Sequence, residues 1–152
     1  MKYVKMEKGD KCLFCRIAED DPNVEKRVIY KDKDFMVIMN MFPYNIGHLE
    51  VVPIRHVVEL TDLDEREFNK MFDFLKKSVE LLKKALNPKG FNVGINLGNI
   101  AGASIEHLHI HVVPRYERDA GFMEIVADTK VMPESIDQTF KKLKKYADIF
   151  KK

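Results

Sequence analysis

Apolar and polar residues follow two different spacings along this chain, and these spacings predict its strands and helices. Short aliphatic and aromatic runs bounded by Gly, Pro, Asn or Asp are typical of strands. They predict five strands, at Arg27–Lys31, Phe35–Asn40, His48–Pro53, Phe91–Leu97 and Leu108–Val113. The first two flank the turn Asp32-Lys33-Asp34, which predicts a hairpin.

A long stretch with helical spacing lies between the third and fourth strands. Thr61 or Asp62 is expected to cap a helix that runs to about Leu86, where Asn87-Pro88-Lys89-Gly90 ends it. Its apolar positions form one line at Phe68, Phe72, Leu75, Val79, Leu82 and Leu86, and a second at Met71, Phe74 and Leu81. A helix of some 25 residues is roughly 37 Å long, more than one small sheet covers. We therefore expect part of this stripe to face a second subunit.

Two further helices complete the predicted fold. One covers Cys12–Glu19, and the other starts at Pro133 and extends to about residue 151. The second has an apolar face made of Ile136, Phe140, Leu143, Ala147 and Phe150. The fold class is α+β with an antiparallel sheet, and we expect residues 1–152 to form a single domain.

Composition excludes several classes of protein. Lys and Arg number 26 against 24 Asp and Glu, and the lysines are spread along the chain, so duplex nucleic acid is not indicated. The sequence has no apolar run long enough for a membrane span and no signal-peptide pattern, which predicts a cytoplasmic protein. Only Cys12 and Cys15 are present, too few for a disulfide scaffold. Their C-x-x-C spacing indicates metal or redox chemistry.

The run HLHIHVVPR carries the strongest functional signal. In a strand, His107, His109 and His111 share one face and the intervening aliphatic residues share the other. The preceding loop, residues 97–104, has two glycines and Ser104, which suit phosphate oxygens. A catalytic zinc held by the three histidines is one interpretation, although alternate strand residues converge poorly on one ion. A nucleophilic imidazole is the other, with the central His109 favoured by position. Exposed or core histidines without a role are a third.

The segment GINLGNIAGASIEHLHIHVVPR resembles the histidine triad (HIT) family, whose His-φ-His-φ-His-φ-φ signature is filled by His107–Val113. The upstream segment VIMNMFPYNIGHLEVVPIRH is similar to the nucleotide-binding half of that family, so the likeness covers about residues 12–116. The resemblance implies a homodimer in which five antiparallel strands from each subunit join into one ten-stranded sheet. It makes the last helix, about residues 133–151, a C-terminal extension.

The resemblance also implies a role for individual residues. His109 would attack the α-phosphorus of a purine nucleotide and form a nucleotidyl-histidine, which water or phosphate then cleaves. Around it, the family pattern implies phosphate contacts from His48 and His111, a leaving-group contact from Ser104, and further nucleotide contacts from Asn96, Gly102, Ala103, Asn40, Leu13, Phe14, Ile17 and Ile38. Among these, Asn40 falls at the ribose and the last four at the base. Ala103 stands where many relatives carry Gln.

The two cysteines gain partners through the same resemblance. Many relatives hold a structural zinc with a C-x-x-C pair, a histidine after the third strand and the first histidine of the triad. Those positions are Cys12, Cys15, His56 and His107. One closed tetrahedral zinc per chain would leave no position for substrate. Reduced thiols or a redox pair are the alternatives.

The residues after the triad narrow the choice of substrate. Pro114-Arg115 and a tail of some 37 residues are similar to the branches that act on dinucleoside polyphosphates, in particular diadenosine tetraphosphate phosphorylases. We therefore expect a dinucleoside polyphosphate to be split by hydrolysis or phosphorolysis. A purine nucleoside phosphoramidase acting on adenosine 5′-phosphoramidate, a nucleotide-binding interaction protein with incidental turnover, and a zinc hydrolase are the alternatives.

Overall fold

The computed structural model describes residues 12–117, 119 and 134–152. Its strands are β1 (Val28–Lys31), β2 (Phe35–Met39), β3 (Leu49–Pro53), β4 (Gly90–Ile95) and β5 (Ile110–Arg115). They form one antiparallel sheet in the order β1-β2-β3-β5-β4. Five antiparallel strands accompanied by helices confirm the predicted α+β class.

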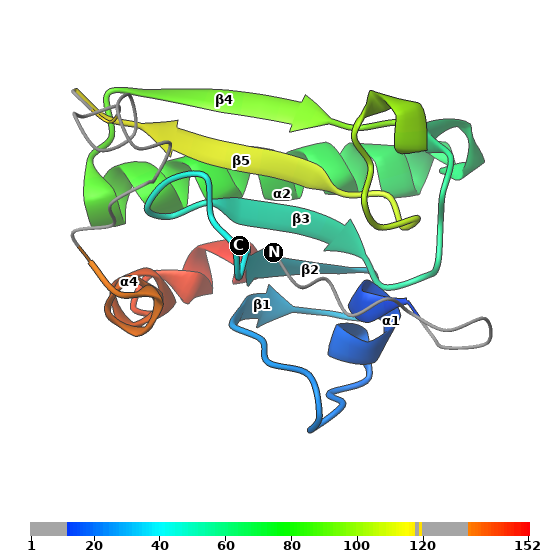
Figure 1. Ribbon diagram of the computed structural model, residues 1–152, viewed down its shortest axis with the longest axis horizontal. Coiled ribbons are helices and arrows are strands. Elements are labelled where there is room, and N and C mark those ends of the chain that lie inside the picture. Colours follow the sequence, from blue (N-terminus) through cyan, green and yellow to red (C-terminus); the bar gives the residue numbers. More distant parts are fainter. Residues whose placement is uncertain (1–11, 118, 120–133) are drawn as a thin grey trace.

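The two faces of the sheet are covered by different helices. Side chains alternate along β2 and β3, so Val37, Leu49 and Val51 belong to the main core that includes α2 (Glu65–Leu86). Met36 and Val52 point the other way and pack with residues of α1 (Leu13–Ala18). Figure 1 shows α2 running behind the sheet, which leaves the opposite face for α1 and for the loops that follow β2 and β4.

The long helix begins later than predicted. Residues Leu60–Asp62 form a short 3₁₀ turn, η1, and Asp64 caps α2 by accepting the backbone N–H of Glu67, whose carboxylate in turn accepts the N–H of Asp64. The prediction that Thr61 or Asp62 caps the helix is therefore wrong, because both residues belong to η1 and the reciprocal capping box forms at Asp64. The predicted end is confirmed: Asn87, in the left-handed conformation, terminates α2.

The face that α2 buries also differs from the first predicted apolar line. Its buried residues are Met71, Phe74, Ser78, Leu81 and Leu82. Phe68 and Phe72, which head the first line, are both 41% exposed. The second predicted line, Met71, Phe74 and Leu81, therefore faces the sheet. The apolar stripe of α2 is wider than the sheet of one chain can bury.

The C-terminal region consists of two elements instead of one continuous helix. Ser135 caps α4 (Ile136–Lys144), and after a break the 3₁₀ turn η3 (Ala147–Lys151) follows. Pro133, expected to open the helix, lies outside the described residues. The break turns Phe150 onto the ring of Tyr30, with centroids 5.4 Å apart. Docking against β1 therefore overrides the helical spacing that predicted one element.

The last strand starts at Ile110, two residues later than predicted, and β4 starts one residue and ends two residues earlier than predicted. His107 and His109 therefore precede β5 and only His111 belongs to it. The extended segment before β5 is held by a bond from the N–H of Leu108 to the carbonyl of Val57, 2.6 Å long. Within the part of the chain that the structure describes, no helix is long and apolar enough to span a membrane.

Candidate functional site

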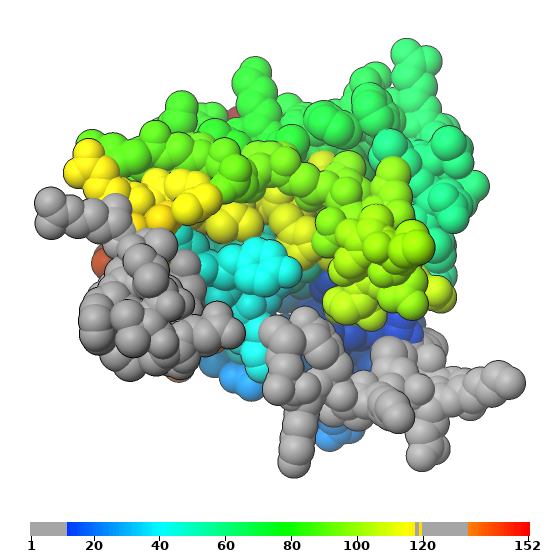
Figure 2. Space-filling model, turned by 45° about the horizontal axis from the view of Figure 1, so that its top comes forward, coloured from blue at the N-terminus to red at the C-terminus, as the bar shows by residue number. Residues whose placement is uncertain are grey.

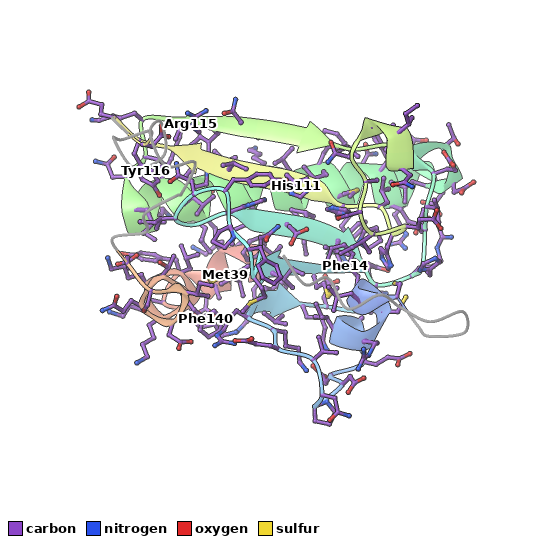
Figure 3. All side chains as sticks on the ribbon, viewed as in Figure 1. Phe14, Met39, His111, Arg115, Tyr116 and Phe140 are labelled. Carbon is purple, nitrogen blue, oxygen red and sulfur yellow. The ribbon has the colours of Figure 1, made fainter. Side chains whose placement is uncertain are left out.

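Four polar side chains gather on the sheet face opposite α2. His48 lies just before β3 and Glu50 within it, whereas His111 is in β5 and His109 directly precedes that strand. Figure 3 labels His111 on β5 and Phe14 on α1, the two elements that approach this site from different sides. Figure 2 shows the loop after β2 in cyan near the middle of this face, with β5 in yellow beside it. The burial of these four polar side chains makes the protonation state of each one sensitive to its neighbours.

Gly47 fixes how the chain enters the site. Its φ of +84° is a conformation that side-chain-bearing residues rarely adopt, and an added Cβ would lie 2.6 Å from Cδ1 of Leu86. The loop therefore presses against the end of α2. The next residue, His48, is fully buried as a result.

A chain of hydrogen bonds sets the tautomers of two histidines. The backbone N–H of Tyr44 donates to Nδ1 of His48 (3.1 Å), so a neutral His48 carries its proton on Nε2. That Nε2–H donates to Nδ1 of His111, 2.9 Å away. His111 is then left with an Nε2–H that can donate to a ligand. Burial is the main reason that the pKa falls to about 3 for His48 and to about 4 for His111.

A hydrogen bond at one ring nitrogen of His109 leaves the other ring nitrogen free to react. Nδ1 lies 2.7 Å from the carbonyl oxygen of His107, which can only accept, so Nδ1 carries the proton. Nε2 therefore keeps its lone pair. Burial lowers the pKa of His109, which favours this neutral form. Phe14 packs against the ring with centroids 4.9 Å apart and holds its orientation.

Glu50 is a residue of this site that the sequence analysis did not select. Its Oε2 lies 3.6 Å from Nε2 of His109, and the side chain is almost fully buried. Burial raises its pKa to about 8. The available signal was a charged residue inside the otherwise apolar run HLEVVP, two positions from His48 and so on the same face of the strand.

The predicted metal ligands come together at the end of the sheet next to α1. Cys12 and Cys15, at the start of that helix, meet His56 and His107, and the four ligand atoms all lie within 4.8 Å of one another. The Sγ···Nδ1 distances are 3.3–3.6 Å. Tetrahedral zinc, with bonds of about 2.3 Å to sulfur and about 2.0 Å to nitrogen, requires separations of about 3.5 Å. The donor set and its spacing fit that ion.

A hydrogen bond to the backbone orients the ring of His107 toward the other metal ligands. Nε2 of His107 lies 2.7 Å from the carbonyl oxygen of Pro53, so it carries the proton and Nδ1 presents its lone pair to the thiols. His107 is buried, and its carbonyl accepts the proton of His109. The metal cluster and the histidine site are therefore joined through one residue.

The glycine loop lies along the approach to β5. It contains the short turn η2 (Asn99–Ala101), and Gly98 and Gly102 both have positive φ, as their placement in a tight turn requires. The side chain of Asn96 lies against Gly102, with its amide nitrogen 3.7 Å from where a Cβ would stand. Ala103 is buried, while Gly102 and Ser104 are exposed.

The residues predicted to contact the base differ in burial from the residue predicted to contact the ribose. Phe14, Ile17 and Ile38 are buried in one cluster, with Leu13 partly buried beside them. Asn40 is half-buried, and its Oδ1 accepts the backbone N–H of Phe42 at 2.8 Å. Its amide nitrogen is the atom of that side chain suited to donate to a ribose hydroxyl.

Comparison with known proteins finds a matching family model and similar chains. A family model described as HIT domain matches residues 21–118. A protein named AP-4-A phosphorylase from Mycobacterium tuberculosis is 45% identical over 116 residues, which are 76% of this chain and 60% of the relative. This chain thus spans less than two thirds of that protein. An uncharacterized HIT-like protein from Methanocaldococcus jannaschii is 33% identical over 88% of this chain and 98% of its own length.

A solved structure supports the fold independently. The crystal structure of a Zn-bound histidine triad family protein from Mycobacterium smegmatis superposes with a TM-score of 0.75 at 28% identity. The match covers 90% of this chain and 93% of the other. The similarity thus extends well beyond the segment around the three histidines.

Proposed function

This chain belongs to the HIT domain family, and from that premise we propose that it is a nucleotidyl hydrolase or transferase. Its substrate would be a dinucleoside polyphosphate such as diadenosine tetraphosphate, attacked at the α-phosphorus through a nucleotidyl-histidine. The likeness to a protein named AP-4-A phosphorylase supports this class of substrate. The observation that carries the proposal is the bond from Nδ1–H of His109 to the His107 carbonyl, which leaves Nε2 as a nucleophile.

In the first step, the lone pair on Nε2 of His109 forms a bond to the α-phosphorus. The bond from that phosphorus to the bridging oxygen breaks, and the polyphosphate portion leaves with the electron pair. His111 donates its Nε2–H toward the phosphate oxygens, a proton that the bond from His48 holds in place. The positive charge that develops on the His109 ring is stabilised by the His107 carbonyl oxygen, which accepts the Nδ1–H hydrogen bond.

In the second step, water or inorganic phosphate attacks the same phosphorus from the side opposite Nε2. The phosphorus–nitrogen bond breaks and the electron pair returns to His109. Water gives AMP and phosphate gives ADP when the nucleoside is adenosine. The loop with Asn96, Gly102 and Ser104 is assigned to the phosphates, in keeping with its exposed backbone and hydroxyl.

The apolar cluster is assigned to the base and the half-buried Asn40 to the ribose. Phe14 contacts both the base cluster and the ring of His109, which supports a binding position next to the nucleophile. Because Leu13 is only partly buried, it offers an accessible apolar edge for a purine.

The four-ligand cluster is assigned to one structural zinc. Bound zinc would contribute folding free energy by joining the start of α1 to His56 and His107. The four protein ligands close its tetrahedron, so the proposed reaction uses the protein's own imidazoles.

The test is turnover of diadenosine tetraphosphate by the wild-type protein and by His109→Ala, with and without inorganic phosphate. We expect the variant to lose turnover by at least about 1,000-fold while it still binds AMP and zinc. Product analysis separates hydrolysis from phosphorolysis. Release of ammonia from adenosine 5′-phosphoramidate in preference to the dinucleotide would instead identify a phosphoramidase. Full activity of His109→Ala would disprove the nucleophile assignment.

A further inference from the structure

Among the residues that the structure describes, Glu50 is the buried acidic side chain at the reaction site, and the two proposed steps do not use it. It belongs to β3, where it pairs with His111 on β5 and with Ile38 on β2. Its side chain therefore points to the same face as the histidines. The carboxylate oxygen Oε2 lies 3.6 Å from Nε2 of His109, the atom assigned to attack phosphorus.

An ionised carboxylate at this position would oppose the reaction in two ways. It would stabilise a proton on Nε2 of His109, and a protonated imidazole has no lone pair to offer. It would also repel the phosphate oxygens that have to approach the same atom. A neutral carboxyl has neither effect, and its O–H is a hydrogen-bond donor.

The surroundings of Glu50 favour the neutral form. The titratable groups that face it are His111 in β5, His109 directly before β5, and His48 directly before its own strand β3. The facing residue on β2, Ile38, is apolar. Among the described residues, the ion pairs of the structure bring neither a lysine nor an arginine to this carboxyl. Burial without a cationic partner raises the pKa of Glu50 to about 8.

We propose that Glu50 is a catalytic residue that acts as a neutral carboxylic acid, donating its O–H to a non-bridging oxygen of the phosphoryl group while His109 attacks. This inference rests on the proposed function. The carboxyl keeps its proton throughout, so it adds no step to the bond changes of the two-step reaction. Because Oε2 lies 3.6 Å from Nε2, the oxygens of a phosphoryl group bound by that nitrogen would lie next to this carboxyl.

A metal ion is the competing explanation for this arrangement. One ligand atom each from Glu50, His109 and His111 lies within 4.8 Å of the others. A cation there would need Glu50 ionised and would occupy the lone pair of His109. The two explanations predict opposite protonation states for the same carboxyl.

The experiment compares zinc-loaded full-length wild type with Glu50→Gln and Glu50→Leu between pH 7 and 9.5. Gln keeps a neutral donor, whereas Leu has none. Glu80→Gln is the matched control, because Glu80 lies on the far helix α2, where it forms an ion pair with Lys84. Above pH 7 the phosphate of AMP is already doubly charged, so its own titration does not contribute.

For the wild type and Glu80→Gln, we expect kcat/KM for diadenosine tetraphosphate to fall about tenfold per pH unit above about pH 8. Glu50→Gln should stay within about tenfold of wild type at pH 7 and lose this alkaline fall. Glu50→Leu should lower kcat by about 100-fold at pH 7. An alkaline fall that persists in Glu50→Gln, or wild-type kcat in Glu50→Leu, would overturn the proposal.

Two further measurements separate this proposal from the proposed function. Calorimetry with AMP as the probe should show wild-type affinity weakening above about pH 8, but not in Glu50→Gln, even if the wild type turns over neither dinucleotide nor phosphoramidate. Infrared difference spectra, wild type minus Glu50→Gln, should contain a protonated-carboxyl band at pH 7. Absence of that band, or a second metal equivalent that Glu50→Gln loses, would contradict a neutral Glu50.

Discussion

Each histidine of the triad has one ring nitrogen committed to a neighbour, and that single bond determines what the other nitrogen can do. His107 gives its Nε2–H to Pro53 and turns Nδ1 toward the thiols. His109 gives its Nδ1–H to a carbonyl and keeps a lone pair on Nε2. His111 accepts at Nδ1 and presents an N–H. Three residues of the same type thus differ in what they present: a lone pair to the thiols from His107, a lone pair for attack from His109, and an N–H donor from His111.

Glu50 also leads to a prediction about stability. Its pKa rises from 4.5 to about 8 in the folded protein. Below about pH 4.5 both folded and unfolded chains keep the proton, and above it the unfolded chain releases the proton first. Wild-type stability should therefore fall by up to about 1.4 kcal/mol per pH unit between pH 4.5 and 8 from this group alone.

Glu50→Gln removes that loss, because an amide does not titrate. Its free energy of unfolding, measured with urea, should exceed the wild-type value by more at pH 8 than at pH 5. Parallel pH dependences for the two proteins would show that the carboxyl is not neutral in the folded state. Glu80→Gln, at a half-exposed helix position, controls for the loss of one charge.

At the scale of elements, sheet alternation explains most of what the sequence predicted correctly. The strand spacing predicted five strands, and the resemblance to the HIT family implied the cluster of Cys12, Cys15, His56 and His107 that the fold does assemble. The positions of element ends were less accurate, since caps depend on local geometry such as the Asp64–Glu67 box. The role of Glu50 could not be predicted, because its chemistry depends on burial beside a residue some 60 positions away.

The turn before β3 is where the backbone is most constrained at the site. Gly47→Ala should destabilise the protein by about 1–3 kcal/mol, since φ is positive and the new methyl group would collide with Leu86. It should also lower kcat, because His48 follows directly. Gly90→Ala is the control, as an added Cβ there meets nothing within 4 Å. Equal unfolding midpoints for the two variants would argue against a constrained turn.

The metal cluster should stabilise the contact between α1 and the sheet. Cys12→Ser removes one thiolate, while the serine hydroxyl can still accept the backbone N–H of Cys15 in the first turn of the helix. We expect loss of about one zinc per chain and a fall in Tm of at least about 5 °C, measured by metal analysis and calorimetry. His109→Ala, which leaves all four ligands in place, should keep its zinc. A Cys12→Ser protein with unchanged metal content and Tm would refute the structural-zinc assignment.

For the whole molecule, the apolar surface that one chain leaves exposed suggests how subunits assemble. Phe68 and Phe72 on α2 are 41% exposed, and Val93 on the edge strand β4 is 47% exposed. Figure 1 places β4 at the border of the sheet, where its open backbone groups can pair with another strand. A two-fold pairing there would give the ten-stranded sheet of the proposed homodimer.

Phe72→Glu should convert that dimer to a monomer in light scattering coupled to gel filtration, because it would put a charge on the exposed apolar face of α2 that we expect a second subunit to cover. Tyr146→Glu, at a position with the same 41% exposure near the C-terminus, should leave the mass unchanged. A wild-type protein that is monomeric at micromolar concentration would contradict the proposed assembly.

The proposed reaction requires that Nε2 of His109 become covalently bound to phosphorus. Wild-type protein mixed with diadenosine tetraphosphate and quenched within one turnover in alkali, where a phosphorus–nitrogen bond survives, should yield a peptide bearing AMP on His109 in the mass spectrum. The adduct should be absent from His109→Ala. Turnover by the wild type without any adduct, together with turnover by His109→Ala, would contradict this mechanism.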